Sequence, residues 1–232
     1  MPTLAVIIPV FNEENTLQES YNRLNEIDDI LTQIIIVDDY SSDSSRQIMN
    51  EIVKQNTKVT VLENPRNLGK GAALMKAQDS ITTDFVVIHD ADLEYFPRDL
   101  RNMYELIKKN NIDLVIGSRF LNDNKKIIYY RTYYANKFLS KVFSIIYKKE
   151  VTDVATCYKM MRSSYFKNVK LQERGFSIEV ELLAKYFNRN IQFLESSIDY
   201  TARTYEEGKK IKVSDGFKYL WSMIKYKLFI KK

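Results

Sequence analysis

The composition of the chain excludes several classes of protein. It has 232 residues, of which 45% are hydrophobic and 28% charged, as expected for one α/β domain with a substantial core. One cysteine and one histidine rule out an internal disulfide framework and a His/Cys zinc site, and they disfavour a histidine-based triad. No apolar run approaches the roughly 20 residues that cross a bilayer.

The net charge of +5 is unevenly spread, with lysines concentrated between Lys209 and Lys232. A basic end interleaved with aromatic and aliphatic residues favours an anionic membrane surface, whereas a uniformly basic surface would suggest nucleic acid. We therefore expect a membrane partner and no nucleic acid. The N-terminus lacks the basic region and cleavage site of a signal peptide, so we expect a cytoplasmic location.

Apolar runs alternate with amphipathic segments along the first half of the chain. The runs at 4–10, 33–39, 59–62, 85–88 and 113–117 predict buried strands, and helices are predicted to open near Asn12, to cover 72–80 and to start at Pro97. Pro9 is expected to end the ladder of the first strand. The alternation predicts an α/β fold with a mostly parallel sheet and helices on both faces.

Acidic residues follow these strands. Asp90 and Asp92 come directly after the run 85–88 and fall on the same side of an extended backbone, and Glu94 follows. Carboxylate oxygens on a turn suit Mg²⁺ or Mn²⁺. For Asp-x-Asp alone, an Asx turn that caps the next helix is about equally plausible. Glu13 and Asp39 also fall at strand ends, where parallel sheets bind ligands.

The loop Gly69–Gly71 is not a P-loop. No glycine lies five positions before Gly69, and Gly71 replaces the Ser or Thr of that motif. The first strand also lacks the glycines of a dinucleotide fingerprint. Kinases, ATPases and ordinary dehydrogenases are therefore excluded.

Several motifs in fixed order carry a family resemblance. They are Ile8–Glu13, Val37–Ser41, Asn67–Gly71, Asp90–Asp92 and Gly117–Arg119, followed by Asp153–Lys159, Gly175–Leu182 and Arg203–Lys209. The first five resemble family 2 glycosyltransferases of the GT-A fold. The last three are similar to the dolichyl-phosphate mannose synthase-like branch, the polyprenyl-phosphate sugar transferases. The resemblance covers roughly residues 4–212.

This resemblance implies a GT-A domain over residues 1–212 and a basic amphipathic C-terminal helix over 213–232, within the same domain or associated with a membrane. It implies an inverting, metal-dependent transferase that moves mannose or glucose from a GDP- or UDP-sugar to a polyprenyl or dolichyl phosphate, with Mg²⁺ or Mn²⁺ as cofactor. Two alternatives stay open: transfer to a sugar hydroxyl of a glycan or glycolipid, and a non-catalytic sugar-nucleotide-binding protein. A sugar nucleotidyltransferase is disfavoured, since no glycine-rich basic loop follows the first strand.

The resemblance also assigns residues to roles. The nucleotide sugar would contact Pro9, Phe11, Glu13, Asp39, Asp90, Arg203 and Lys209. The acceptor phosphate would contact Arg119, Arg131 and Asn136. Asp90, Asp92 and Glu94 would hold the metal, and Asp90, Asp92, Arg119 and Asp153 would be catalytic, with Asp153 aligning the acceptor. Lys70 is left out of this set, because it could reach a phosphate or be solvated. His89 is expected to pack on the opposite side of its strand.

Two amphipathic stretches, 133–146 and 217–228, show apolar residues at helical spacing with lysines between them. The acceptor's lipid tail is expected along the first. The second, at the basic end of the chain, is expected to hold the protein peripherally at the cytoplasmic face of a membrane. An integral-membrane partner subunit would be compatible with this arrangement.

Overall fold

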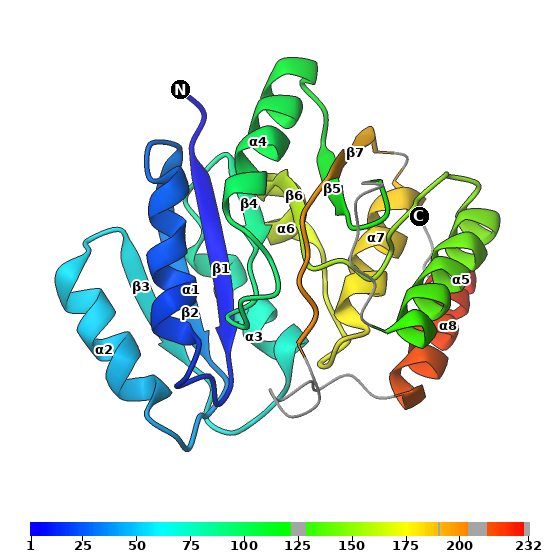
Figure 1. The fold of residues 1–232 in the computed structure, drawn as a ribbon. Helices are drawn as coiled ribbons and strands as arrows, with labels where there is room; N and C mark the ends of the chain where they lie inside the picture. Colours follow the sequence, from blue (N-terminus) through cyan, green and yellow to red (C-terminus); the bar gives the residue numbers. More distant parts are fainter. Residues whose placement is uncertain (122–128, 190, 204–212, 230–232) are drawn as a thin grey trace.

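The computed structural model describes residues 1–121, 129–189, 191–203 and 213–229. Its centre is a seven-stranded sheet with the strand order β3-β2-β1-β4-β6-β5-β7 (Figure 1). The strands are β1 (Leu4–Val10), β2 (Leu31–Asp38), β3 (Val59–Glu63), β4 (Phe85–Ile88), β5 (Leu114–Ser118), β6 (Lys159–Arg162) and β7 (Phe193–Ser197). The five predicted strands are confirmed, with ends that differ by at most two residues.

The sheet is mostly parallel, as predicted. The pairs β1–β2, β1–β4, β2–β3 and β5–β7 are parallel, whereas β6 runs antiparallel to both β4 and β5. Strands β1, β4 and β5 are almost completely buried, which explains their continuous apolar sequences. The antiparallel β6, which the sequence pattern did not predict, is the exception within this parallel core.

The expectation that Pro9 ends the first ladder is wrong. Pro9 and Val10 stay in register with Val37 and Asp38 of β2. On the other side, the pairing of β1 with β4 ends at Ile7 and Ile88, followed by the bond from the His89 N–H to the Ile7 carbonyl. The backbone N–H and C=O groups of successive residues in a strand point alternately to the strands on its two sides. The missing N–H of Pro9 therefore falls on the side where β4 has already ended.

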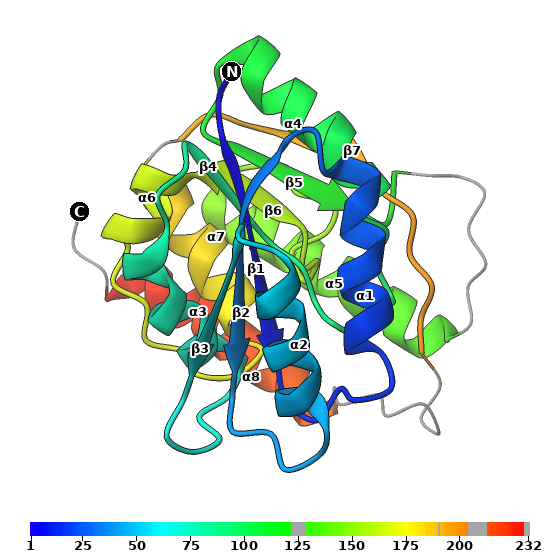
Figure 2. The same cartoon turned by 90° about the vertical axis from the view of Figure 1, so that its left-hand side faces the viewer.

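Helices cover both faces of the sheet. They are α1 (Leu17–Arg23), α2 (Ser45–Gln55), α3 (Lys70–Ala77), α4 (Arg98–Asn110), α5 (Tyr130–Tyr147), α6 (Ser163–Asn168), α7 (Ile178–Asn188) and α8 (Val213–Leu228), with short 3₁₀ turns η1 (Leu24–Ile27) and η2 (Gln78–Ser80). Figure 2 shows α1 and α2 on one side of the sheet and α3 and α6 on the other. The helix predicted over 72–80 is α3 together with η2.

The helix expected to open at Asn12 begins later. Asn12 has a positive φ of 52°, and α1 starts at Leu17 after Thr16. The Asn12 side chain instead accepts a hydrogen bond from the Ser42 N–H at 2.8 Å, which ties the end of β1 to the loop after β2. An asparagine that could cap a helix therefore braces two loops at the carboxyl edge of the sheet.

The two amphipathic stretches form α5 and α8, which pack against each other and against α7 (Figure 1). Tyr219, Met223 and Tyr226 of α8 are buried, and the Tyr147 hydroxyl donates to the Met223 carbonyl at 2.9 Å. One side of α8 is therefore part of the core. Within the described ranges, no helix combines the length and apolar character needed to cross a membrane.

Candidate active site

One pocket of about 760 Å³ lies at the carboxyl edge of β1, β2 and β4 and extends to α5 and α8. It is lined by the predicted nucleotide residues Pro9, Phe11, Glu13, Asp39 and Arg203, the predicted metal ligands Asp90, Asp92 and Glu94, and the predicted acceptor residues Arg119, Arg131 and Asn136. Asp153 does not line it, and Lys209 lies outside the described residues. The fold thus brings together predicted site residues that are separated by up to 194 positions in sequence, from Pro9 to Arg203.

Asp39 holds the loop that closes one side of the pocket. Its Oδ1 accepts hydrogen bonds from the Asn64 side chain at 2.8 Å and the Leu68 N–H at 3.0 Å, and its Oδ2 accepts from the Gly69 N–H at 2.7 Å. The carboxylate is almost completely buried. Asp39 therefore has a structural role in placing the loop before α3, beside the nucleotide role that the sequence predicts.

Glycine is required in this loop because another chain segment passes over it. Gly69 has a φ of 93°, and a Cβ at Gly69 or Gly71 would collide with the carbonyls of Arg174 and Glu173. The Gly71 N–H donates to the Arg174 carbonyl at 2.6 Å. This close approach fixes the first turn of α3, whose first residue is Lys70.

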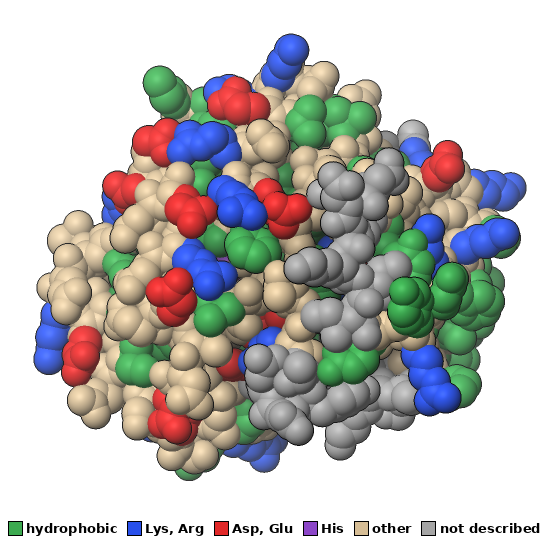
Figure 3. All heavy atoms as spheres, viewed as in Figure 1, with side chains coloured by type: hydrophobic (Ala, Val, Ile, Leu, Met, Phe, Trp, Pro, Cys, Tyr) green, Lys and Arg blue, Asp and Glu red, His purple; other side chains and the backbone are tan. Residues whose placement is uncertain are grey.

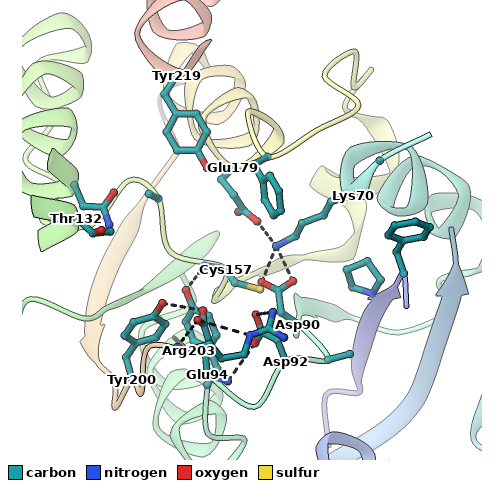
Figure 4. Close-up of a pocket in the computed structure, with 18 of the residues that line it drawn as sticks. Lys70, Asp90, Asp92, Glu94, Thr132, Cys157, Glu179, Tyr200, Arg203 and Tyr219 are labelled. Carbon is teal, nitrogen blue, oxygen red and sulfur yellow. Dashed lines mark hydrogen bonds and ion pairs between the residues drawn. The ribbon is translucent and has the colours of Figure 1, made fainter. Parts of the chain in front are cut away.

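Arg203 lies among three carboxylates from the loops that follow β1 and β4. Its Nη1 is 3.2 Å from Glu13 Oε2, its Nη2 is 3.1 Å from Asp92 Oδ2 and its Nε is 3.9 Å from Glu94 Oε1. The Arg203 N–H also donates to Glu94 at 2.9 Å, and the Tyr200 hydroxyl donates to the other Glu94 oxygen at 2.8 Å. The segment that follows β7 thereby closes over the acidic edge (Figure 4).

The carboxylates outnumber the cation in this group. Burial, together with the nearby charges of Asp90 and Glu94, raises the pKa of Asp92 from 3.8 to about 8, although Arg203 opposes the shift. A carboxyl group in this state gains strongly from an additional positive charge. The group therefore has the electrostatic character of a cation site.

Asp90 belongs to a second, separate ion-pair network. The Lys70 ammonium lies 2.7 Å from Asp90 Oδ1 and 2.8 Å from Glu179 Oε1, and the other Glu179 oxygen is 2.7 Å from the fully buried Lys159 ammonium (Figure 4). Burial opposes charge on Lys70, but Asp90 and Glu179 outweigh it and raise the lysine pKa. Sequence patterns assigned no role to Lys70 and did not single out Glu179 within its motif.

Arg119, in the pocket wall, pairs with Asp153 behind it. The guanidinium donates from Nε and Nη2 to the two Asp153 oxygens at 2.7 and 2.8 Å, and its cationic carbon lies 4.9 Å from the centre of the Tyr200 ring. Asp153 is fully buried. The charge of Arg119 is therefore balanced within the protein, and the predicted alignment of the acceptor by Asp153 remains a prediction.

His89 is a packed histidine, as predicted. Its ring is buried, with nitrogens 3.0 Å from the Ser20 hydroxyl and 2.9 Å from the Tyr158 hydroxyl, and burial lowers its pKa to about 4. It lies on the side of the strand end away from the pocket, and it is absent from the lining.

The far end of the pocket is formed by helices. Arg131 and Asn136 of α5 line it together with Leu139, with Tyr219 of α8 and with Phe176 before α7. The lining thus changes from acidic at the strand ends to apolar with one guanidinium at α5. A ligand that carries both charge and hydrocarbon would match this gradient.

The donor set suits a hard divalent cation, although the carboxylates are already partnered. Asp90, Asp92 and Glu94 supply only oxygen ligands, which Mg²⁺ and Mn²⁺ prefer. Within the described part of the chain, no group of three or more His, Cys, Asp or Glu side chains is arranged as a ready metal site. Lys70 and Arg203 instead occupy the carboxylates.

Comparison with known proteins agrees with this geometry. The sequence matches the family described as glycosyl transferase family 2 over residues 5–170, so the chain belongs to that family. It is 28% identical over 191 residues to a dolichol-phosphate mannosyltransferase of Pyrococcus furiosus, covering 78% of this chain and 52% of that protein. It is 28% identical over 211 residues to an undecaprenyl-phosphate 4-deoxy-4-formamido-L-arabinose transferase of Edwardsiella ictaluri, covering 89% of this chain and 62% of that protein.

These relatives confirm the resemblance to the polyprenyl-phosphate sugar transferase branch, and the chain spans less than two thirds of the length of either. It also aligns with an uncharacterized Methanocaldococcus jannaschii protein, with 25% identity over 90% of this chain and 94% of that protein. Among solved structures, it resembles glucosyl-3-phosphoglycerate synthase of Mycobacterium tuberculosis with Mn²⁺, UDP and phosphoglyceric acid, with a TM-score of 0.73 and 17% identity over 100% of this chain and 80% of that one. The GT-A fold is thereby confirmed.

Proposed function

We propose that this family 2 glycosyltransferase moves a hexose, mannose or glucose, from a GDP- or UDP-sugar to a polyprenyl phosphate at a membrane surface. The observation that carries the proposal is the continuity of the pocket from the strand-end carboxylates to Arg131 of α5 and Tyr219 of α8. A diphosphate donor and a phosphate on a long apolar chain are substrates that suit its two ends. The names of the two relatives are consistent with this acceptor class.

The donor would bind at the acidic end. Pro9 and Phe11 offer an apolar wall for a base, and Glu13 and Asp39 offer acceptor oxygens for base and ribose donors. Asp90, Asp92 and Glu94 would hold Mg²⁺ or Mn²⁺, which supplies charge neutralisation for the departing diphosphate. Arg203, already at this edge, would add a guanidinium to the same oxygens. Lys209, which lies outside the described residues, is proposed to bind the nucleotide sugar as well.

The acceptor chemistry requires little of the protein. A phosphate oxygen would form the new bond to the anomeric carbon from the face opposite the diphosphate, as the bond from that carbon to the diphosphate oxygen breaks and the configuration inverts. A phosphate monoester is largely ionised near pH 7, because its second pKa is about 6, so no general base is needed. The protein has to position the phosphate.

The described pocket residues fit that requirement. Arg131 and Asn136 line the acceptor end, whereas Asp153 is buried against Arg119 and the Glu179 carboxylate is paired with two lysines. A guanidinium binds phosphate oxygens through parallel hydrogen bonds. A hydroxyl acceptor would instead need a carboxylate that can take its proton, and Asp153 would then have to separate from Arg119.

Peripheral membrane binding would follow from the outer faces of α5 and α8. Tyr134, Phe138 and Ile145 of α5 and Phe217 and Trp221 of α8 are exposed. Figure 3 shows hydrophobic side chains beside basic ones at the edge of the molecule formed by α5. Exposed aromatic rings next to lysines are typical of surfaces that bind anionic lipid headgroups. The proposed location is the cytoplasmic face, and an integral-membrane partner would be compatible with it.

A product assay tests the proposal. The protein is incubated with UDP-glucose or GDP-mannose and a short polyprenyl phosphate in detergent with Mn²⁺, and lipid-linked hexose is measured. Arg131→Ala should lower the rate about tenfold or more, since a charged hydrogen bond is worth about 1.5–3 kcal/mol. The matched control is Arg101→Ala on α4, which removes an exposed ion pair with Asp29.

Transfer to a free sugar in preference to the lipid phosphate, with no effect of Arg131→Ala, would contradict the acceptor assignment. Binding of nucleotide sugar without any product from either acceptor would instead favour a non-catalytic binding protein. Separate assays with each donor also identify the base and the sugar.

A further inference from the structure

Lys70 contacts the first carboxylate of the Asp-x-Asp motif more closely than any other cation described. Its ammonium is 2.7 Å from Asp90 Oδ1 and 2.9 Å from Oδ2, so it bridges both oxygens (Figure 4). The side chain is only 10% exposed. This lysine is therefore a fixed part of the site, and the sequence-based alternative of a solvated lysine is wrong.

Both ends of Lys70 are held in place. Its backbone follows Gly69, whose N–H is bound by Asp39 at 2.7 Å. Its ammonium is held from the other side by Glu179 at 2.8 Å, and Glu179 is fixed in turn by Lys159 at 2.7 Å. A lysine anchored in this way has lost its rotamer freedom in the folded protein, so it can set the orientation of Asp90.

The second carboxylate of the motif has a basic partner as well, because Arg203 lies 3.1 Å from Asp92. A divalent cation that approached Asp90 would meet the positive charge of Lys70 a few ångströms away, in a pocket where water screens poorly. A nucleoside diphosphate changes this balance, since its phosphates bring negative charge for the cation and give the ammonium another partner. Cation and diphosphate should therefore bind more favourably together than separately.

We propose that Lys70 is a positioning residue that holds Asp90 in place and makes cation binding depend on the donor diphosphate. The proposal rests on the proposed function of this pocket as a nucleotide-sugar site. By linkage, the diphosphate strengthens cation binding by the same factor by which the cation strengthens diphosphate binding. This reciprocity gives two independent measurements of one coupling.

The test measures Mn²⁺ binding directly, by electron paramagnetic resonance of the free ion, with the complete chain and without any turnover. UDP and GDP serve as diphosphate probes. The wild-type protein should bind Mn²⁺ at least about tenfold more tightly with the matching nucleotide than without it, within the usual range of coupling between sites. Calorimetry should show the same factor for the nucleotide with and without Mn²⁺.

Three variants separate the role of charge from a loss of fold. Lys70→Met and Lys70→Gln should bind Mn²⁺ more tightly without nucleotide and should lose most of the coupling, whereas Lys70→Arg should retain it. Lys58→Met is the matched control, because Lys58 pairs with Asp28 at the surface. Its coupling should equal that of the wild type.

The outcomes distinguish this inference from the proposed function. If UDP and GDP both fail to bind with Mn²⁺ present, both proposals fall. If a nucleotide binds but wild-type Mn²⁺ affinity is the same with and without it, the role of Lys70 is overturned and the nucleotide site stands. Wild-type coupling in both Lys70→Met and Lys70→Gln would overturn it as well.

Discussion

The Arg119 guanidinium and the Asp153 carboxylate form a bidentate pair in the protein interior, with nitrogen–oxygen distances of 2.7 and 2.8 Å. Asp153 also accepts the Arg119 N–H at 3.1 Å. Because Asp153 is fully buried, its removal would leave a guanidinium without a counter-charge. The carboxylate predicted to align the acceptor is therefore first of all a structural partner of Arg119.

Asp153→Ala should destabilise the protein by about 3–5 kcal/mol, the usual cost of breaking a buried pair from one side. Urea unfolding followed by circular dichroism measures this loss. Asp28→Ala, which removes the exposed partner of Lys58, should cost less than about 1 kcal/mol. A stable Asp153→Ala protein with impaired turnover would instead indicate a direct role in the reaction.

Gly71→Ala should disturb the first turn of α3, because its methyl group would collide with the Glu173 carbonyl. Overpacking of this kind costs about 1–3 kcal/mol, and the shift of Lys70 should also weaken nucleotide binding. Gly175→Ala is a close control, since no atom lies within 4 Å of its added methyl group. Thermal melts and UDP titrations of both proteins make the comparison. Equal behaviour of the two variants would argue against the strict packing of this loop.

Asp99, in the first turn of α4, gives a prediction about pH. Burial raises its pKa from 3.8 to about 6, although the hydrogen bond from the Asp199 N–H opposes the shift. Between about pH 4 and 6, Asp99 therefore keeps its proton in the folded chain and loses it in the unfolded chain. As pH rises through this range, ionisation of Asp99 lowers the free energy of unfolding.

Asp99→Asn should remove that penalty. Because Asp99 is only partly buried, solvent screening reduces the effect to about 1 kcal/mol, so the variant should match the wild type near pH 4 and melt about 2–4 °C higher at pH 7. Thermal melts across this pH range test it, with Asp79→Asn at an exposed position as control. A constant difference at every pH would show that titration of Asp99 is not the cause.

Membrane binding is best tested with point changes on α8. Truncation after Gly216 would remove Tyr219, Met223 and Tyr226, which are buried in the core. A combined Phe217→Ser and Trp221→Ser variant changes exposed side chains only, and it should reduce flotation with vesicles that contain anionic lipid. Leu194→Ser, at a partly exposed position on β7, is the control. Equal flotation of the wild type, the double variant and the control would contradict membrane binding through the exposed side of α8.

Removal of the metal should abolish most of the activity. Chelation with EDTA, or Asp92→Asn, is expected to lower turnover by about 10²-fold or more, because the charge on the leaving diphosphate would lose its counter-ion. Added Mn²⁺ should restore the chelated wild type and should not fully restore the variant. Unchanged turnover in EDTA would mean that Arg203 and Lys70 suffice without a cation.

The sequence determined the first five strands and the acidic edge, whereas β6 and β7 were not predicted. A continuous apolar run such as 4–10 is typical of an inner parallel strand buried on both faces, and a carboxylate that ends such a strand lies at the edge where the strands stop. Asp90, Asp92 and Glu13 were found in this way. Alternation along the strand also placed His89 on the opposite side from Asp90. These are local consequences of backbone geometry.

Tertiary structure decided which charges meet. The approach of Lys70 to Asp90, of Glu179 to Lys70 and of Arg203 to Asp92 depends on how α3, α7 and the segment after β7 pack around the strand ends. The antiparallel course of β6 likewise depends on its neighbours β4 and β5. Ion pairs between distant segments have no periodic sequence signal, because their energy arises only when packing excludes water and brings the charges into contact.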